Sequence, residues 1–146
     1  MTVRGGAALY TPAILAWAVE LADYPMTADL PLTGEAHSRV CGSRIAIGMA
    51  LDAQGRIAAT GAQVTACAIG QAAAALFLKG ARGSSAPQIG DMLLGIEAWL
   101  AGDEPMPDWP GLALLEPARA YPARHPAIVL PWKAALAALS KWAPAP

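Results

Sequence analysis

Two cysteines and one histidine are the residues of this chain best suited to metal or sulfur chemistry. Cys41 precedes Gly42, whose conformational freedom permits a tight turn that would point the thiol outward. Cys67 lies where a predicted strand meets a predicted helix, and the free N–H groups at a helix N-terminus stabilise a thiolate. His125 precedes Pro126 near another predicted helix start. These three soft or borderline ligands predict an open metal site formed by Cys41, Cys67 and His125.

Each of these residues also has an ordinary structural interpretation. A cysteine in an alanine-rich protein is usually a small buried residue. The two cysteines could form a disulfide, although a reducing cytosol disfavours one. A single histidine such as His125 is more often a surface or hydrogen-bonded residue, and His37 has no predicted helix terminus near it. On spacing alone, two cysteines and one distant histidine are a weak signal of a metal site.

The composition limits the class of protein. The chain has 146 residues and a net charge of -1, with 55% hydrophobic and 14% charged residues, which favours one folded domain over a disordered chain. Without a basic excess, duplex nucleic acid is not an expected partner. Two cysteines are too few for a disulfide-rich secreted scaffold or a four-cysteine zinc module. We predict a single domain over residues 1–146, with a loose tail at residues 143–146.

Two stretches of the chain are apolar enough to raise a membrane interpretation. Ile57–Leu78 carries no formal charge and has the length to span a bilayer, but it contains two glutamines, two threonines and two glycines. Ala7–Val19 has the outline of a signal peptide, but Pro12 interrupts it and acidic residues follow directly. We therefore expect an amphipathic first helix, no transmembrane segment and a cytoplasmic location.

The elements that must position the cysteines begin with a predicted hairpin. Strict alternation of apolar residues predicts a half-buried strand over Arg44–Leu51, followed by a turn at Asp52–Gly55. The second strand begins at Arg56, and a change in the face of its apolar residues predicts a bulge near residues 60–61. Ala36–Val40 is a predicted edge strand. This hairpin would bring the two cysteines to the same end of the sheet.

Helical spacing and capping residues predict the rest of the chain. The last helix is expected over Pro131–Trp142, with Pro126 or Pro131 at its first position. The other predicted helical segments are Pro12 to about Asp23, Ala68–Lys79, a helix that is capped by Ser85 and Gln88 and ends at Gly102, and one turn at Leu112–Leu115. The order of helix, three-strand sheet and several helices predicts an α+β fold, a small antiparallel sheet packed against helices.

The segments around the two cysteines resemble a known family. Ser38–Ser43 before a strand, and Ala66–Ala72 at the start of a helix, are similar to iron–sulfur cluster assembly scaffolds of the NifU N-terminal and IscU-like type. Leu9–Thr11, Tyr121–Arg124 and Leu130–Leu136 resemble the two ends of that family. The resemblance implies a sandwich of sheet and helices, no enzymatic turnover, and transient binding of iron, a [2Fe–2S] cluster or zinc. It also implies two kinds of partner, a cysteine desulfurase and the proteins that receive clusters.

Within this resemblance, Cys41 and Cys67 match the first two of three family cysteines. The family's acidic residue falls at Ser43 and its third cysteine at Ala127, so two metal-site residues are replaced. His125 lies one residue before the family's histidine position and could substitute as a ligand. Two thiolates and one imidazole leave a four-coordinate metal one ligand short. Water, a partner side chain or a second protomer must complete the shell, and a dimer that shares one cluster would do so.

Three functions follow from these residues. The first is an iron–sulfur scaffold or carrier that uses Cys41 and Cys67, with His125 as a further ligand. The second is a degenerate relative that binds an assembly partner, such as a cysteine desulfurase, without carrying a cluster. The third is a zinc-binding regulator or sulfur-transfer accessory in which Cys67 accepts a persulfide.

Overall fold

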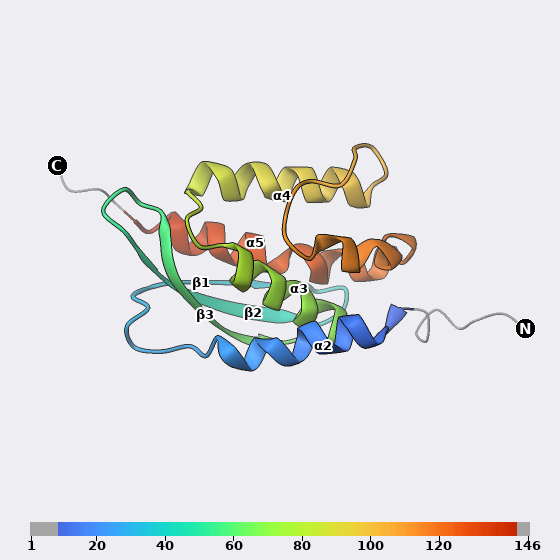
Figure 1. Cartoon of the computed structure of the whole chain (residues 1–146), viewed down its shortest axis with the longest axis horizontal. Helices are drawn as coiled ribbons and strands as arrows, with labels where there is room; N and C mark the ends of the chain where they lie inside the picture. The colour runs from blue at the N-terminus through green and yellow to red at the C-terminus, as the bar shows by residue number, and fades with distance from the viewer. Residues whose placement is uncertain (1–8, 143–146) are drawn as a thin grey trace, which may run out of the picture.

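A computed structural model describes residues 9–142 of the chain (Figure 1). The loose tail predicted at residues 143–146 lies outside the described part. Three strands and four α-helices, joined by short 3₁₀ segments, make up the described chain. In order they are α2 (Pro12–Glu20), η1 (Leu21–Asp23), β1 (Leu32–His37), β2 (Arg44–Leu51), β3 (Ile57–Thr65), α3 (Ala68–Gly80), α4 (Ala86–Leu100), η2 (Leu112–Ala120), η3 (Pro122–Arg124) and α5 (His125–Leu139).

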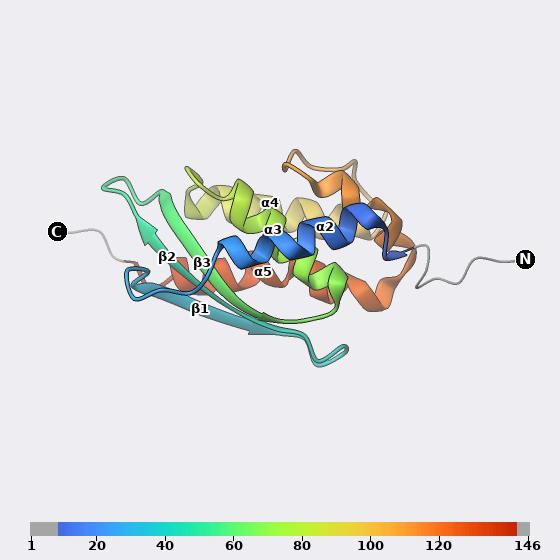
Figure 2. The same ribbon diagram turned by 60° about the horizontal axis from the view of Figure 1, so that its bottom comes forward.

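The three strands form one antiparallel sheet in the order β1-β2-β3. Helices α3 and α5 lie over one face of this sheet, α2 packs beside α3, and α4 packs on α5 (Figure 2). Ile45, Ile47 and Met49 point from β2 into this helical layer and are buried. The opposite face is covered near its middle by Met26 and Leu30, which lie against Gly48. The α+β class and the small antiparallel sheet predicted from the sequence are confirmed.

Helix starts follow the local capping chemistry. The Thr11 hydroxyl accepts a hydrogen bond from the Ile14 N–H at 3.2 Å, with Pro12 in the first turn of α2. Ser85 and Gln88 form a reciprocal capping box at the start of α4. Each cap satisfies backbone N–H groups that the first helical turn leaves free. Local sequence is therefore sufficient to place these two helix starts.

Small residues allow α5 to lie directly on the sheet. Gly34 of β1 has no side chain, and a Cβ at this position would collide with the Ala134 carbonyl oxygen of α5. Ala134, Ala135 and Ala138 are fully buried on the same side of α5. The alanine-rich composition thus forms a core in which two backbones approach closely, instead of one filled by large side chains.

Two strand predictions are wrong in position. The edge strand is Leu32–His37, not Ala36–Val40, because the chain turns after His37, where the Ser38 N–H donates to the Ser43 carbonyl oxygen at 2.8 Å. The bulge expected near residues 60–61 is absent there. The register instead shifts beside the hairpin turn, where Leu51 pairs with Ile57 and leaves Ala58 unpaired.

The helical predictions need two corrections. Helix α5 begins at His125 and ends at Leu139, so Pro126 occupies its first turn and Pro131 lies inside it, fully surrounded by the core. Interior proline usually breaks a helix, but here the contacts of α5 with the sheet, α3 and α4 outweigh the lost hydrogen bond. The single turn expected at Leu112–Leu115 continues as a 3₁₀ segment to Ala120.

Ile57–Leu78 divides into β3 and α3, and within residues 9–142 no helix combines the length and apolarity of a membrane span.

The Gly34 contact makes a testable prediction. Gly34→Ala forces a methyl group into the α5 backbone, and we expect the free energy of unfolding to fall by about 3 kcal/mol, as overpacking a tight core does. Gly90→Ala is the matched control, because its Cβ would lie 4.0 Å from the nearest heavy atom, in Leu136. That change should raise stability by about 0.5–1 kcal/mol. Denaturant titration of both variants checks the difference, and equal stabilities would contradict it.

Candidate functional site

Cys41 lies in the tight turn that connects β1 to β2. Gly42 follows it with a φ of 70°, in the left-handed region that glycine adopts readily, as its place after Cys41 predicted. The turn is closed by the Gly42 N–H, which donates to the Ser38 carbonyl oxygen at 2.9 Å. The thiol of Cys41 is free and half-buried. The sulfur is therefore held on a short, hydrogen-bonded turn and remains partly open to solvent.

Cys67 lies at the N-cap of α3, directly after β3. Its backbone is extended, with φ −65° and ψ 171°, and its side chain makes no capping hydrogen bond. Arg44 pairs with Thr65 across the hairpin, so Cys41 and Cys67 each lie within three residues of the same rung of the sheet. Figures 1 and 2 both show the β1–β2 turn and the first turn of α3 at one end of the molecule, here called the cysteine end. Cys67 is also free and half-buried.

Two serines surround the Cys41 sulfur. Cys41 Sγ and Ser43 Oγ form a hydrogen bond of 3.1 Å, and Ser38 and Ser43 are both buried. Burial raises the pKa of the Cys41 thiol. The hydroxyls of Ser43 and Ser38, the Ser43 backbone and the positive charge of Arg124 outweigh burial, so the pKa lies below its usual value. Cys41 is thus easier to ionise than an ordinary cysteine.

The first turn of α5 also lies at the cysteine end. Ala127 is buried, and a Cβ added to Gly70 in the first turn of α3 would lie 3.4 Å from the Ala127 Cβ. The position that the family resemblance assigned to a third cysteine is therefore close to the start of α3, which Cys67 caps. A methyl group occupies this position and supplies no ligand.

His125 points to another part of the molecule. Its Nε2 lies 3.0 Å from the Arg119 carbonyl oxygen, and the ring lines a groove of about 330 Å³ between α4 and α5, beside Glu97 and Lys133. Residues two apart on a helix point about 200° apart, so Ala127 faces α3 while His125 faces α4. Across residues 9–142 no three Cys, His, Asp or Glu side chains gather closely enough to hold a metal ion. The structure therefore does not join His125 to the two cysteines.

Ser38 and Arg124 belonged to segments that carry the family resemblance but were not predicted as site residues, and Ser43 was named individually only at the position of the family's acidic residue. A spacing signal was present, because a serine lies three residues before Cys41 and another two residues after it. Hydroxyls at those positions can meet a sulfur on the same turn. Arg124 had no such signal, since only the packing of α5 brings it near Cys41.

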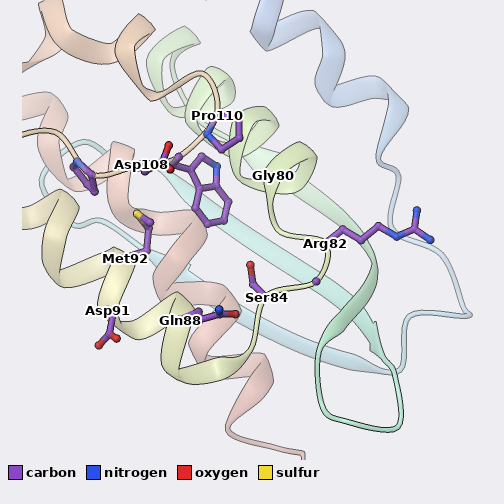
Figure 3. Close-up of a pocket in the computed structure, with 11 residues that line it drawn as sticks. Gly80, Arg82, Ser84, Gln88, Asp91, Met92, Asp108 and Pro110 are labelled. Carbon is purple, nitrogen blue, oxygen red and sulfur yellow. The ribbon is translucent and has the colours of Figure 1, made fainter.

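A cavity of about 510 Å³ opens at the far end of α3 from Cys67. It is lined by Gly80 at the end of α3, by Gln88 and Met92 of α4 and by the ring of Trp109. Figure 3 shows Met92 and Pro110 bordering this space, while the Arg82 side chain extends away from it. The Trp109 Nε1 donates to the Leu76 carbonyl oxygen at 2.8 Å, which anchors the cavity wall to α3. Its lining contains no cysteine or histidine, so it is separate from the thiol site.

Comparison with solved structures finds proteins of the same architecture. A nitrogen-fixing NifU-like protein (N-terminal) from Brucella abortus is 23% identical, with a TM-score of 0.83 over 94% of this chain and 96% of that chain. A putative iron–sulfur cluster assembly scaffold protein for the SUF system from Fervidobacterium islandicum AW-1 is 19% identical, with a TM-score of 0.77 over 90% and 96%. No protein-family model and no curated protein sequence matches the chain. The NifU-like fold that the resemblance implied is confirmed.

The serine contacts lead to a titration prediction. Ser43→Ala removes the nearest hydroxyl from the Cys41 sulfur, so the thiolate loses stabilisation and the pKa of Cys41 should rise. The thiolate absorbance followed against pH, in a Cys67→Ser background, measures this shift. Ser140→Ala, at the other end of α5, is the control and should leave the titration unchanged. A Cys41 titration that does not move in Ser43→Ala would contradict the assignment.

Proposed function

We propose that this protein is a scaffold or carrier in iron–sulfur cluster assembly and binds iron or a [2Fe–2S] cluster transiently through Cys41 and Cys67. Zinc is the alternative metal for the same thiols. The observation that carries the proposal is the sheet register, which puts two free, half-buried thiols at one end of a NifU-like fold. Thiolates are the preferred protein ligands of iron–sulfur clusters and suit zinc as well.

The ligand set favours delivery over permanent storage. Two thiolates fill only two positions of a four-coordinate metal, so the remaining positions must come from water, a second protomer or a partner protein. His125 stays a predicted third ligand. Its Nε2 is engaged by the Arg119 carbonyl, which leaves Nδ1 for a metal, but the first turn of α5 would have to rotate to present it. A metal held by so few protein ligands leaves readily.

The proposed partners follow from this chemistry. A scaffold does not make sulfide, so a cysteine desulfurase supplies sulfur and iron–sulfur apoproteins receive the cluster. This assignment is supported by the likeness to the putative SUF-system scaffold. The protein would act in the cytoplasm, where thiols remain reduced and able to bind metal. The protein itself carries out no enzymatic turnover in this scheme.

One second function has an observation in its favour. Ser43 and Ala127 stand where the family resemblance expects ligands, and the described residues hold no group of three ligands. A relative that binds assembly partners without carrying a cluster fits this depleted site. The carrier function needs both cysteines to hold metal. The partner-binding function needs only the protein surface and would survive the loss of the cysteines.

Anaerobic reconstitution distinguishes these functions. With iron and sulfide, the wild-type chain should develop a visible cluster chromophore, and Cys41→Ser or Cys67→Ser should abolish it, because one remaining thiolate cannot hold the cluster. His125→Gln should reduce cluster retention only if the histidine is a ligand. A colourless, metal-free wild type, together with a desulfurase pull-down that survives Cys41→Ser/Cys67→Ser, would reject the carrier function in favour of the partner-binding one.

Restoring a third thiol makes a further prediction. Ala127→Cys would place a sulfur beside the first turn of α3, and we expect zinc or iron to be lost to a chelator about tenfold more slowly, a difference of roughly 1.4 kcal/mol. Ser140→Cys adds a thiol at the opposite end of α5 and should not change this rate. Chelator competition followed by elemental analysis gives the measurement. Equal retention in the two variants would show that position 127 does not face the metal.

A further inference from the structure

Positive charge without a carboxylate partner collects at the cysteine end. Arg39 and Arg44 are exposed on the two sides of the Cys41 turn, and Arg124 is close enough for its charge to act on the Cys41 sulfur. None of these arginines forms an ion pair among the described residues. The ion pairs among the described residues lie away from the cysteine end, at Lys79–Glu20, Arg119–Glu116 and Lys133–Glu97.

A cavity of about 430 Å³ opens within this basic region. Arg39 and Arg44 line it together with Ser38 and Ser43, and Glu35 is the one acidic residue in its lining. The buried hydroxyls of Ser38 and Ser43 both act on the Cys41 sulfur, so the charged donors that the cavity presents are the two arginine side chains. The cavity therefore offers two guanidinium groups to an acceptor that carries negative charge.

An apolar side chain at the tip of the same turn indicates what kind of molecule binds. Val40 is 72% exposed although it is β-branched and apolar. An exposed apolar residue bordered by arginines is typical of a surface that contacts protein, where arginine is enriched. A free small anion would use the arginines but would gain nothing from Val40. The combination favours a segment of polypeptide.

We propose that the cysteine end docks an acidic segment of the protein that delivers sulfur, and that Arg39, Arg44 and Arg124 select this segment by charge. The inference rests on the proposed function only in taking Cys41 as a site of sulfur delivery. Complementary charge speeds the encounter and suppresses neutral or basic partners. The exposed Val40 then provides a short-range apolar contact on the same turn as the sulfur.

A disulfide-exchange assay tests the selection without metal. Two peptides of equal length each carry one cysteine that is activated as a 2-thiopyridyl disulfide. Glutamates and aspartates flank this cysteine in one peptide, and glutamines and asparagines flank it in the other. The Cys41 thiolate of the Cys67→Ser protein attacks the peptide sulfur, a new S–S bond forms, and thiopyridone leaves with the bonding electron pair and takes up a proton. Its absorbance gives the rate. The acidic peptide should react about tenfold faster at low salt, and the advantage should shrink as salt rises.

Single substitutions then assign the selection to residues. Arg39→Gln, Arg44→Gln and Arg124→Gln should each lower the acidic-to-amide rate ratio by about two- to threefold, the size expected for one partly screened charge. The ratio cancels any change in the intrinsic reactivity of the sulfur. Arg82→Gln is the matched control, because Arg82 is exposed and lies by the cavity at the far end of α3. It should leave the ratio unchanged.

Three results would overturn the proposal. The first is an acidic-to-amide rate ratio near one for the Cys67→Ser protein, and the second is a loss of this ratio in Arg82→Gln equal to that in the three arginine variants. The third is that a single-stranded oligonucleotide slows the reaction of Cys41 at concentrations where the acidic peptide, without its activated cysteine, does not. The last result would assign the basic region to nucleic acid. Failed cluster reconstitution would leave the ratio unaffected, so the two proposals can fail separately.

Discussion

The arrangement of this molecule depends on the direct contact between the backbone of α5 and strand β1. Gly34 and the buried alanines of α5 remove the side chains that would otherwise separate a helix from a sheet. The contact continues past the helix, where Lys141 donates to the Thr33 carbonyl oxygen at 2.6 Å. Because α5 is held along its length, its first turn is brought to the cysteine end. Arg124 and Ala127 owe their places near Cys41 and α3 to this contact.

The Cys41 turn carries hydroxyls where the family resemblance expects a carboxylate. A carboxylate would bind a metal directly and add negative charge beside the thiolate. The Cys41 thiol donates to the Ser43 hydroxyl oxygen at 3.1 Å, and after ionisation that hydroxyl can donate to the thiolate, which helps to lower the pKa of Cys41 and leaves the sulfur as the group that reacts or coordinates. The resemblance expects ligands at positions 43 and 127, where this chain has Ser43 and Ala127, while Cys41 remains ionisable. In the proposed function, few protein ligands would surround the metal and the Cys41 sulfur would stay available to react.

The proposed metal site and the basic surface around Cys41 are compatible parts of one mechanism. A carrier must release its cargo, and few protein ligands permit that release. Specificity must then come from outside the metal shell, from the surface that meets the partner. The net charge of the chain is −1, yet the arginines around Cys41 lack carboxylate partners among the described residues. Charge selection at this end can distinguish partners without tightening the metal site.

Local sequence alone determined the helix starts at Pro12 and Ala86, the strand Arg44–Leu51, the hairpin turn after it and the tight turn at Gly42. Each of these depends on neighbours within a few residues, through caps, alternation or the freedom of glycine. The hairpin also sufficed to predict that Cys41 and Cys67 share one end of the sheet. The course of α5 through Pro131, the separation of His125 from the cysteines and the approach of Arg124 to Cys41 were decided by tertiary structure. They depend on how α5 packs between the sheet, α3 and α4, and residues distant in sequence set that packing.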